Sequence, residues 1–112
     1  MRTEDIEGHR PSKWVPCTDL RTLAALGKLA EECGELSSII ARCVIQGVDG
    51  MDPETGMSNL TSLEHELADV RGLSRLVIEH LHLMKNQIEE RAEKKLQMKR
   101  DWLEMLREDD NG

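Results

Sequence analysis

The stretch "LAEECGELSSII" (residues 29–40) has the apolar spacing of a helix, but it carries acids inside its apolar face. At about 100° per residue, Leu29 and Ile39 lie within roughly 60° of Glu32 on a helical wheel. Glu35 lies about 60° from Glu32 on the same wheel, so both carboxylates share the apolar stripe. An unpaired carboxylate in an apolar setting is strongly disfavoured. This placement therefore calls for a chemical reason.

The segment "LEHELADV" (residues 63–70) repeats the arrangement. With Glu66 as the reference, Asp69 lies about 60° to one side, and Leu63 and Val70 lie within roughly 60° on the other. Both segments thus place acids at positions i and i+3 within an apolar stripe. The sequence predicts two helices that aim four carboxylates at a shared space.

A divalent cation would remove both the burial cost and the mutual repulsion of these acids. Carboxylate oxygens suit hard ions such as Mg²⁺ or Mn²⁺. We therefore expect Glu32, Glu35, Glu66 and Asp69 to be metal ligands. The alternative is that the acids form salt bridges with lysines of another helix, or that they face solvent.

The composition favours an all-α fold. The 112 residues include no Phe and no Tyr, and the apolar set consists mainly of Leu, Ile, Val, Ala and Met. We predict a single domain over residues 18–108, built as an antiparallel helical bundle. It follows an N-terminal arm (1–17) and precedes a frayed tail (109–112).

Three helices are expected within this domain. The first begins after Thr18 or Asp19 and ends at Gly47. A loop over 47–60 leads to a second helix that starts near 58–62. Asn86 looks like the cap of a third helix, which would run from about residue 87 to about 107. His80 is expected at the surface.

Charge and cysteine content exclude several classes of protein. The net charge of -7 disfavours binding to DNA or RNA. No apolar run reaches membrane-spanning length, and the N-terminus has no secretory apolar region. Three cysteines without a CxxC pair argue against a disulfide framework or a structural zinc site. A cytoplasmic location is the simplest expectation.

The paired pattern EExxE and ExxD resembles the MazG-like nucleoside triphosphate pyrophosphohydrolases, which belong to the all-α NTP pyrophosphatases. Here it reads "KLAEECGELSSII" and "LEHELADVRGLSRLV", and the resemblance covers roughly residues 20–100. It implies a helical bundle completed by oligomerisation, as a homodimer or homotetramer. Two positions depart from the usual pattern: His65 stands where Glu is common, and Ala68 stands where Gly is frequent.

The resemblance implies that the four acids bind Mg²⁺, which holds the triphosphate and activates water for attack at the α-phosphorus. The products would be a nucleoside monophosphate and pyrophosphate. Glu31, on the border of the stripe, would take a proton from that water or would contact the metal ligands without binding the metal itself. The alternative is that Glu31 is a solvent-facing acid.

Several further residues are candidates for substrate binding. Lys28 lies one turn before Glu32, about 40° away on the wheel. Lys95 and Arg100 lie in the third helix, where related enzymes carry phosphate-binding cations, but the Asn that often accompanies them is missing. Trp14 either packs on a helix or stacks on a nucleobase. A solvated basic face is the alternative for the cations.

Two other functions stay open. One is a relative with a narrower substrate, such as dUTP or a single purine dNTP like dGTP. The other is a non-catalytic helical oligomer or adaptor whose acids make salt bridges. These two classes differ in one observable way: only the enzyme requires the four acids to converge.

Overall fold

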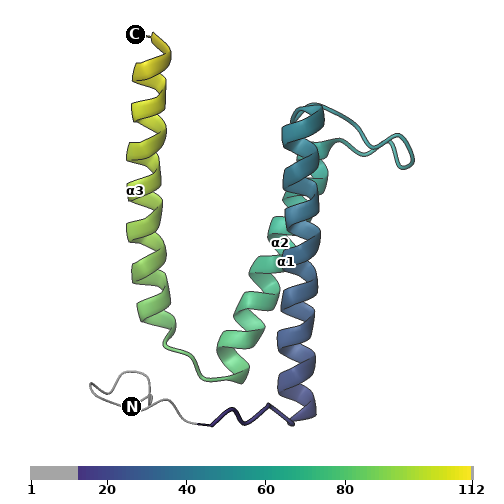
Figure 1. Cartoon of the computed structure of the whole chain (residues 1–112), viewed down its shortest axis with the longest axis vertical. Coiled ribbons are helices and arrows are strands. Elements are labelled where there is room, and N and C mark those ends of the chain that lie inside the picture. Colours follow the sequence, from purple (N-terminus) through teal and green to yellow (C-terminus); the bar gives the residue numbers. More distant parts are fainter. Residues whose placement is uncertain (1–12, 112) are drawn as a thin grey trace.

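The described part of the chain folds into three helices (Figure 1). A computed structural model describes residues 13–111, with side chains described as far as residue 107. The helices are α1 (Leu20–Gln46), α2 (Asn59–His80) and α3 (Lys85–Asn111). No strand occurs in this part of the chain, where an isolated bridge joins Met51 to Ser58. The all-α prediction is confirmed.

The ends of α1 and the start of α2 follow local capping chemistry. Asp19 caps α1 by accepting a hydrogen bond from the backbone of Thr22, and Ser58 caps α2 in the same way through Thr61. Gly47 ends α1 with φ of 92°, a left-handed conformation that glycine adopts without strain. These boundaries match the predicted ones within one or two residues.

Helices α1 and α2 pack side by side as an antiparallel hairpin (Figure 1). Among the described residues, Ala25 on α1 and Val77 on α2 are the buried apolar residues. Leu29, Leu36 and Ile39 are half-buried along the same face of α1. The core of a single chain is therefore a thin layer between two helices.

The loop end of the hairpin is held by Asn59, whose side chain is completely buried. Its Nδ2 donates to the carbonyl of Gly47 at 2.9 Å and to Oε1 of Gln46 at 3.3 Å. A Cβ at Gly50 would lie 2.9 Å from that same nitrogen, so the close approach requires glycine. An ion pair between Arg42 and Asp52, at 3.2 Å, ties the loop to α1.

The opposite end is held by His80, which corrects the prediction that this histidine lies free at the surface. It is the last residue of α2 and is half-buried, and its Nε2 lies 2.8 Å from Oγ1 of Thr22. The same hydroxyl donates to Asp19 at 2.7 Å. The first turn of α1 is thereby joined to the last turn of α2.

Helix α3 starts earlier than predicted and ends later. Residue Asn86 is not its cap, because the first backbone bond runs from the amide of Ile88 to the carbonyl of Met84. The helix begins at Lys85 and continues to Asn111, through most of the predicted tail. His82 makes the preceding turn with φ of 53°.

Helix α3 stands apart from the hairpin (Figure 1). Within the described residues it packs on neither α1 nor α2 to any extent. The radius of gyration is 18.9 Å, whereas a compact chain of this length has about 13 Å. Within the described residues, α3 therefore adds little to the two-helix core.

None of the three helices, which span most of the described chain, combines the length and apolar character that crossing a membrane requires.

Replacing Asn59 with Ala should lower the free energy of unfolding by about 1–3 kcal/mol, because the Gly47 carbonyl loses its buried donor. Chemical denaturation followed by circular dichroism measures this. The matched control is Asn86→Ala, at an exposed position of α3, which should change stability by less than about 0.5 kcal/mol. Equal effects of the two substitutions would contradict the role given to Asn59.

Candidate metal centre

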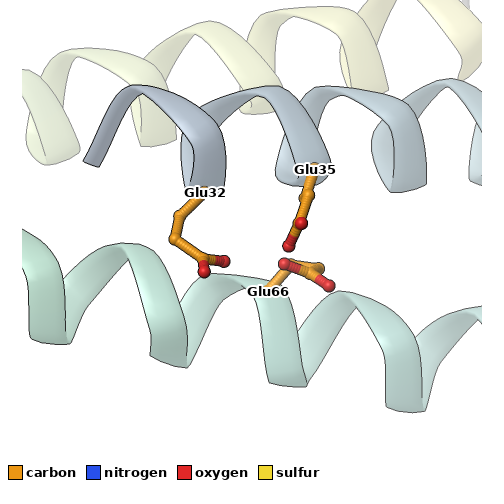
Figure 2. A group of neighbouring side chains, drawn as sticks. All are labelled: Glu32, Glu35 and Glu66. Carbon is orange, nitrogen blue, oxygen red and sulfur yellow. The ribbon is translucent and has the colours of Figure 1, made fainter. Parts of the chain in front are cut away.

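Three glutamates meet between α1 and α2. Glu32 and Glu35 point from α1 toward α2, and Glu66 points back from α2 (Figure 2). One carboxylate oxygen of each lies within 4.8 Å of the corresponding oxygens of the other two. This acidic cluster, defined as Glu32, Glu35 and Glu66, spans the two helices at mid-height of the hairpin.

The cluster contains buried oxygen atoms without partners. Glu32 is only 9% exposed, Glu66 is half-buried, and Glu35 is exposed. Oε2 of Glu32 and Oε2 of Glu66 are shielded from solvent and have no hydrogen-bond partner. Buried polar atoms in native proteins are nearly always satisfied, so an unmatched pair points to an absent ligand.

Protonation is one way to relieve this arrangement. Burial is the main cause that raises the pKa of Glu32, followed by the close approach and the negative charge of the Glu35 carboxyl group. Burial also raises the pKa of Glu66, followed by the negative charges of Glu35 and Asp69. Burial first, and the like charge of neighbouring acids second, therefore disfavour the ionised forms of Glu32 and Glu66.

Asp69, the fourth predicted ligand, is not part of the cluster. It is exposed on α2, but its charge still contributes to the raised pKa values of Glu32 and Glu66. The structure therefore brings together three of the four predicted ligands and leaves Asp69 beside them. The helical period places Asp69 on the correct face of α2, but it does not specify how deeply the side chain reaches.

Glu31 and Lys28 pair with each other beside the cluster. Lys28 Nζ donates to Oε2 of Glu31 at 3.2 Å, and both side chains are 54% exposed. This hydrogen bond is the main cause that raises the pKa of Lys28, and the charges of Glu32 and Glu35 add to it. Lys28 therefore lies close enough for the charges of the cluster to raise its pKa. Glu31 faces solvent in this pairing.

The remaining predicted substrate residues are not brought to the cluster within one chain. Lys95 and Arg100 are exposed on α3, which stands apart from the hairpin. Trp14 precedes α1 and is 98% exposed, so it packs on no helix of its own chain. A role for these three residues depends on a substrate or on another copy of the chain.

Glu79 and His82 have the Glu-x-x-His spacing of di-iron helical bundles, but they do not share a helix face. Glu79 is exposed near the end of α2, and His82 lies beyond that helix in a left-handed turn. The helical spacing that would place both on one face is broken between them.

An open groove lies elsewhere, around the start of α3. Its lining residues are Leu83, Met84, Gln87, Ile88, Glu90, Arg91 and Lys94. It begins beyond the far end of α2, roughly 20 Å along the helix from Glu66 at 1.5 Å per residue. Without convergent acids, and far from the cluster, it offers no chemistry comparable to that of the three glutamates.

The donor set fits a hard divalent cation. All three residues of the cluster present carboxylate oxygens, which are the ligands that Mg²⁺ and Mn²⁺ prefer. Two of these residues carry the unpartnered buried oxygens. A cation there would give both atoms a partner and would offset the burial and the repulsion that raise the pKa values of Glu32 and Glu66.

Comparison with protein-family models, with curated proteins and with solved structures found no match to this chain. The interpretation of the cluster therefore depends on its own geometry and on the motif resemblance.

The raised pKa values predict an unusual pH dependence for the metal-free protein. Because the folded state holds protons on Glu32 and Glu66 above their ordinary pKa of 4.5, their contribution favours folding most below that pH. This contribution declines as the pH rises through the raised values. Without divalent ions, Glu66→Gln should therefore make the protein more stable than wild type at about pH 7, and the gain should shrink toward about pH 4.

Denaturant melts at several pH values in the presence of a chelator measure this. Glu64→Gln is the matched control, since Glu64 is exposed and lies two residues away on α2; it should behave like wild type. A Glu66→Gln protein that is less stable than wild type at pH 7 would refute the claim that the ionised Glu66 carboxylate destabilises the folded state.

Proposed function

We propose that this chain is a Mg²⁺-dependent nucleoside triphosphate pyrophosphohydrolase, which converts an NTP or dNTP to the monophosphate and pyrophosphate. The observation that supports this is the convergence of Glu32, Glu35 and Glu66, with two buried oxygens unsatisfied. The paired EExxE and ExxD pattern supports the reaction class by resemblance.

The chain's own residues would hold the cation and its substrate in a fixed geometry. Glu32, Glu35 and Glu66 supply the ligands, and Asp69 lies beside them on α2 to complete the set. Bound Mg²⁺ would neutralise phosphate charge and would orient and acidify the attacking water. Because both ends of the hairpin are held by side-chain hydrogen bonds, the spacing of the acids on α1 and α2 is fixed.

Two residues beside the cluster have roles in this proposal. Lys28 Nζ would turn from Oε2 of Glu31 toward a substrate phosphate, since it already lies in the field of the cluster. The freed Glu31 carboxylate would then accept the proton of the attacking water. Both side chains are half exposed, so neither movement requires the backbone to change.

The adaptor alternative is less well supported. It requires the acids to form salt bridges, but in the described part of the chain no Lys or Arg makes an ion pair with any of the three cluster glutamates. The base preference, including a dUTP-specific or dGTP-specific enzyme, has no discriminating feature in the geometry. We also propose a homodimer or homotetramer, because Lys95 and Arg100 can approach a cluster only in another copy.

A panel of NTPs and dNTPs, incubated with and without Mg²⁺, tests the reaction. We expect release of pyrophosphate and a nucleoside monophosphate from at least one substrate, and none when a chelator is present. Chromatography of the nucleotide products identifies the bond that is cleaved. Formation of a nucleoside diphosphate and inorganic phosphate would show that the bond is wrongly assigned, and no metal-dependent release from any substrate would refute the activity.

Glu35→Gln should reduce kcat/KM by at least about 100-fold, because even residues that only support a metal ligand cost about 10–100-fold when mutated. Glu35 is exposed, so the fold should survive, as circular dichroism can verify. Glu64→Gln is again the control and should retain activity. Full activity of Glu35→Gln would remove Glu35 from the proposed ligands.

A further inference from the structure

Helix α1 carries a second apolar seam that α2 does not cover. Its seven positions alternate spacings of three and four residues along nearly the whole helix, and all are exposed. These positions, called the exposed seam below, are Leu23, Leu26, Ala30, Cys33, Ser37, Ile40 and Val44. Such spacing is the signature of a helix that packs against another helix over several turns.

The face of α1 that packs on α2 has the same spacing, displaced by one residue. Its positions, from residue 25 to residue 43, are all buried or half-buried: Ala25, Leu29, Glu32, Leu36, Ile39 and Cys43. The exposed seam lies roughly 100° further around the helix. A helix with two such seams is suited to packing between two neighbouring helices, whereas within residues 13–111 only α2 packs on α1.

The charges of α1 avoid the exposed seam. On a helical wheel its charged residues fall within an arc of roughly 100°. They are Arg21, Lys28, Glu31, Glu32, Glu35 and Arg42. The remaining circumference is apolar or small and uncharged, which is unusual for a surface that stays in water.

Large apolar side chains of the exposed seam remain exposed to water in a single chain, at positions spread over most of the length of α1. At the ends of the exposed seam, Leu23 and Ile40 are each 47% exposed and Val44 is 80% exposed.

The exposed seam is complementary to itself. Large side chains occupy both ends, and small residues occupy the centre: Ala30, Cys33 and Ser37. A second copy running antiparallel about a two-fold axis near Cys33 therefore places Leu23 and Leu26 against Ile40 and Val44 of that copy. The small centres face each other and allow the backbones to approach closely. Antiparallel helix dipoles also attract.

The other candidate for this seam is α3 of a second copy, and it fits less well. The apolar stripe of α3, through Leu96 and Leu103, also contains Lys95 and Lys99. Against an uncharged face these ammonium groups would be buried without a partner, which is costly. A second α1 brings no charge to the contact.

We propose that two copies of this chain associate through the exposed seam of α1, packed antiparallel on itself about a two-fold axis near Cys33. This interface makes an α2–α1–α1–α2 layer and does not depend on the proposed activity. A tetramer would contain the same contact.

Crosslinking through the chain's own cysteines tests the contact. A variant with Cys33 as the only cysteine (Cys17→Ser, Cys43→Ser) should form a covalent dimer with a short bifunctional maleimide. The matched variant that keeps only Cys43 should not, because two copies of residue 43 would lie about 30 Å apart along the antiparallel pair.

A second experiment introduces a charged residue into α1 and determines the mass of the assembly by light scattering. Ala30→Glu, in the exposed seam, should lower the mass of the assembly at least twofold. Ala24→Glu, an exposed position of the same helix on its charged side, should leave the mass unchanged. Circular dichroism verifies that both variants remain helical, and the crosslinking result stands by itself if Ala30→Glu does not fold.

Three outcomes would overturn the proposal. The wild-type chain could be monomeric at concentrations up to the millimolar range. It could be oligomeric while Cys33 fails to crosslink, which would place the contact on another face, such as α3. Finally, crosslinking through Cys43 would mean that the helices pair in parallel.

Discussion

Between α1 and α2, the carboxylates of Glu32, Glu35 and Glu66 crowd like charges into a partly buried space. Glu32 and Glu66 each bury an oxygen without a partner, and burial together with neighbouring charge raises both pKa values. Two helices would ordinarily move apart or rotate to relieve such a cost. The hairpin instead holds the acids together, which makes sense if a cation normally lies between them.

The hairpin can sustain this strain because both of its ends are held. Asn59 joins the loop to the end of α1, and His80 joins the last turn of α2 to Thr22 in the first turn of α1. The apolar layer between the helices is thin, and Ala25 and Val77 are its buried apolar residues in the described chain. Polar contacts at the ends therefore supply much of the alignment that a larger core would give.

The sequence predicts the helices and the cluster well because both follow from local rules. Capping by Asp19 and Ser58 depends on residues three positions away, and the helical period alone places Glu32, Glu35 and Glu66 on facing stripes. Contacts between segments that are far apart in the sequence produce no periodic pattern of residues. The bond between His80 and Thr22 joins residues far apart in sequence, and the separation of α3 depends on packing partners that periodicity cannot identify.

A titration with Mn²⁺ tests whether the cluster binds a divalent cation. Electron paramagnetic resonance of the free ion at about pH 7.5 measures how much is bound. We expect saturable binding to the metal-free chain, displacement of Mn²⁺ by Mg²⁺, and loss of binding in a helical Glu32→Gln, Glu66→Gln double variant. Unchanged free Mn²⁺ in the presence of wild-type protein, or equal binding by the double variant, would contradict binding at the cluster.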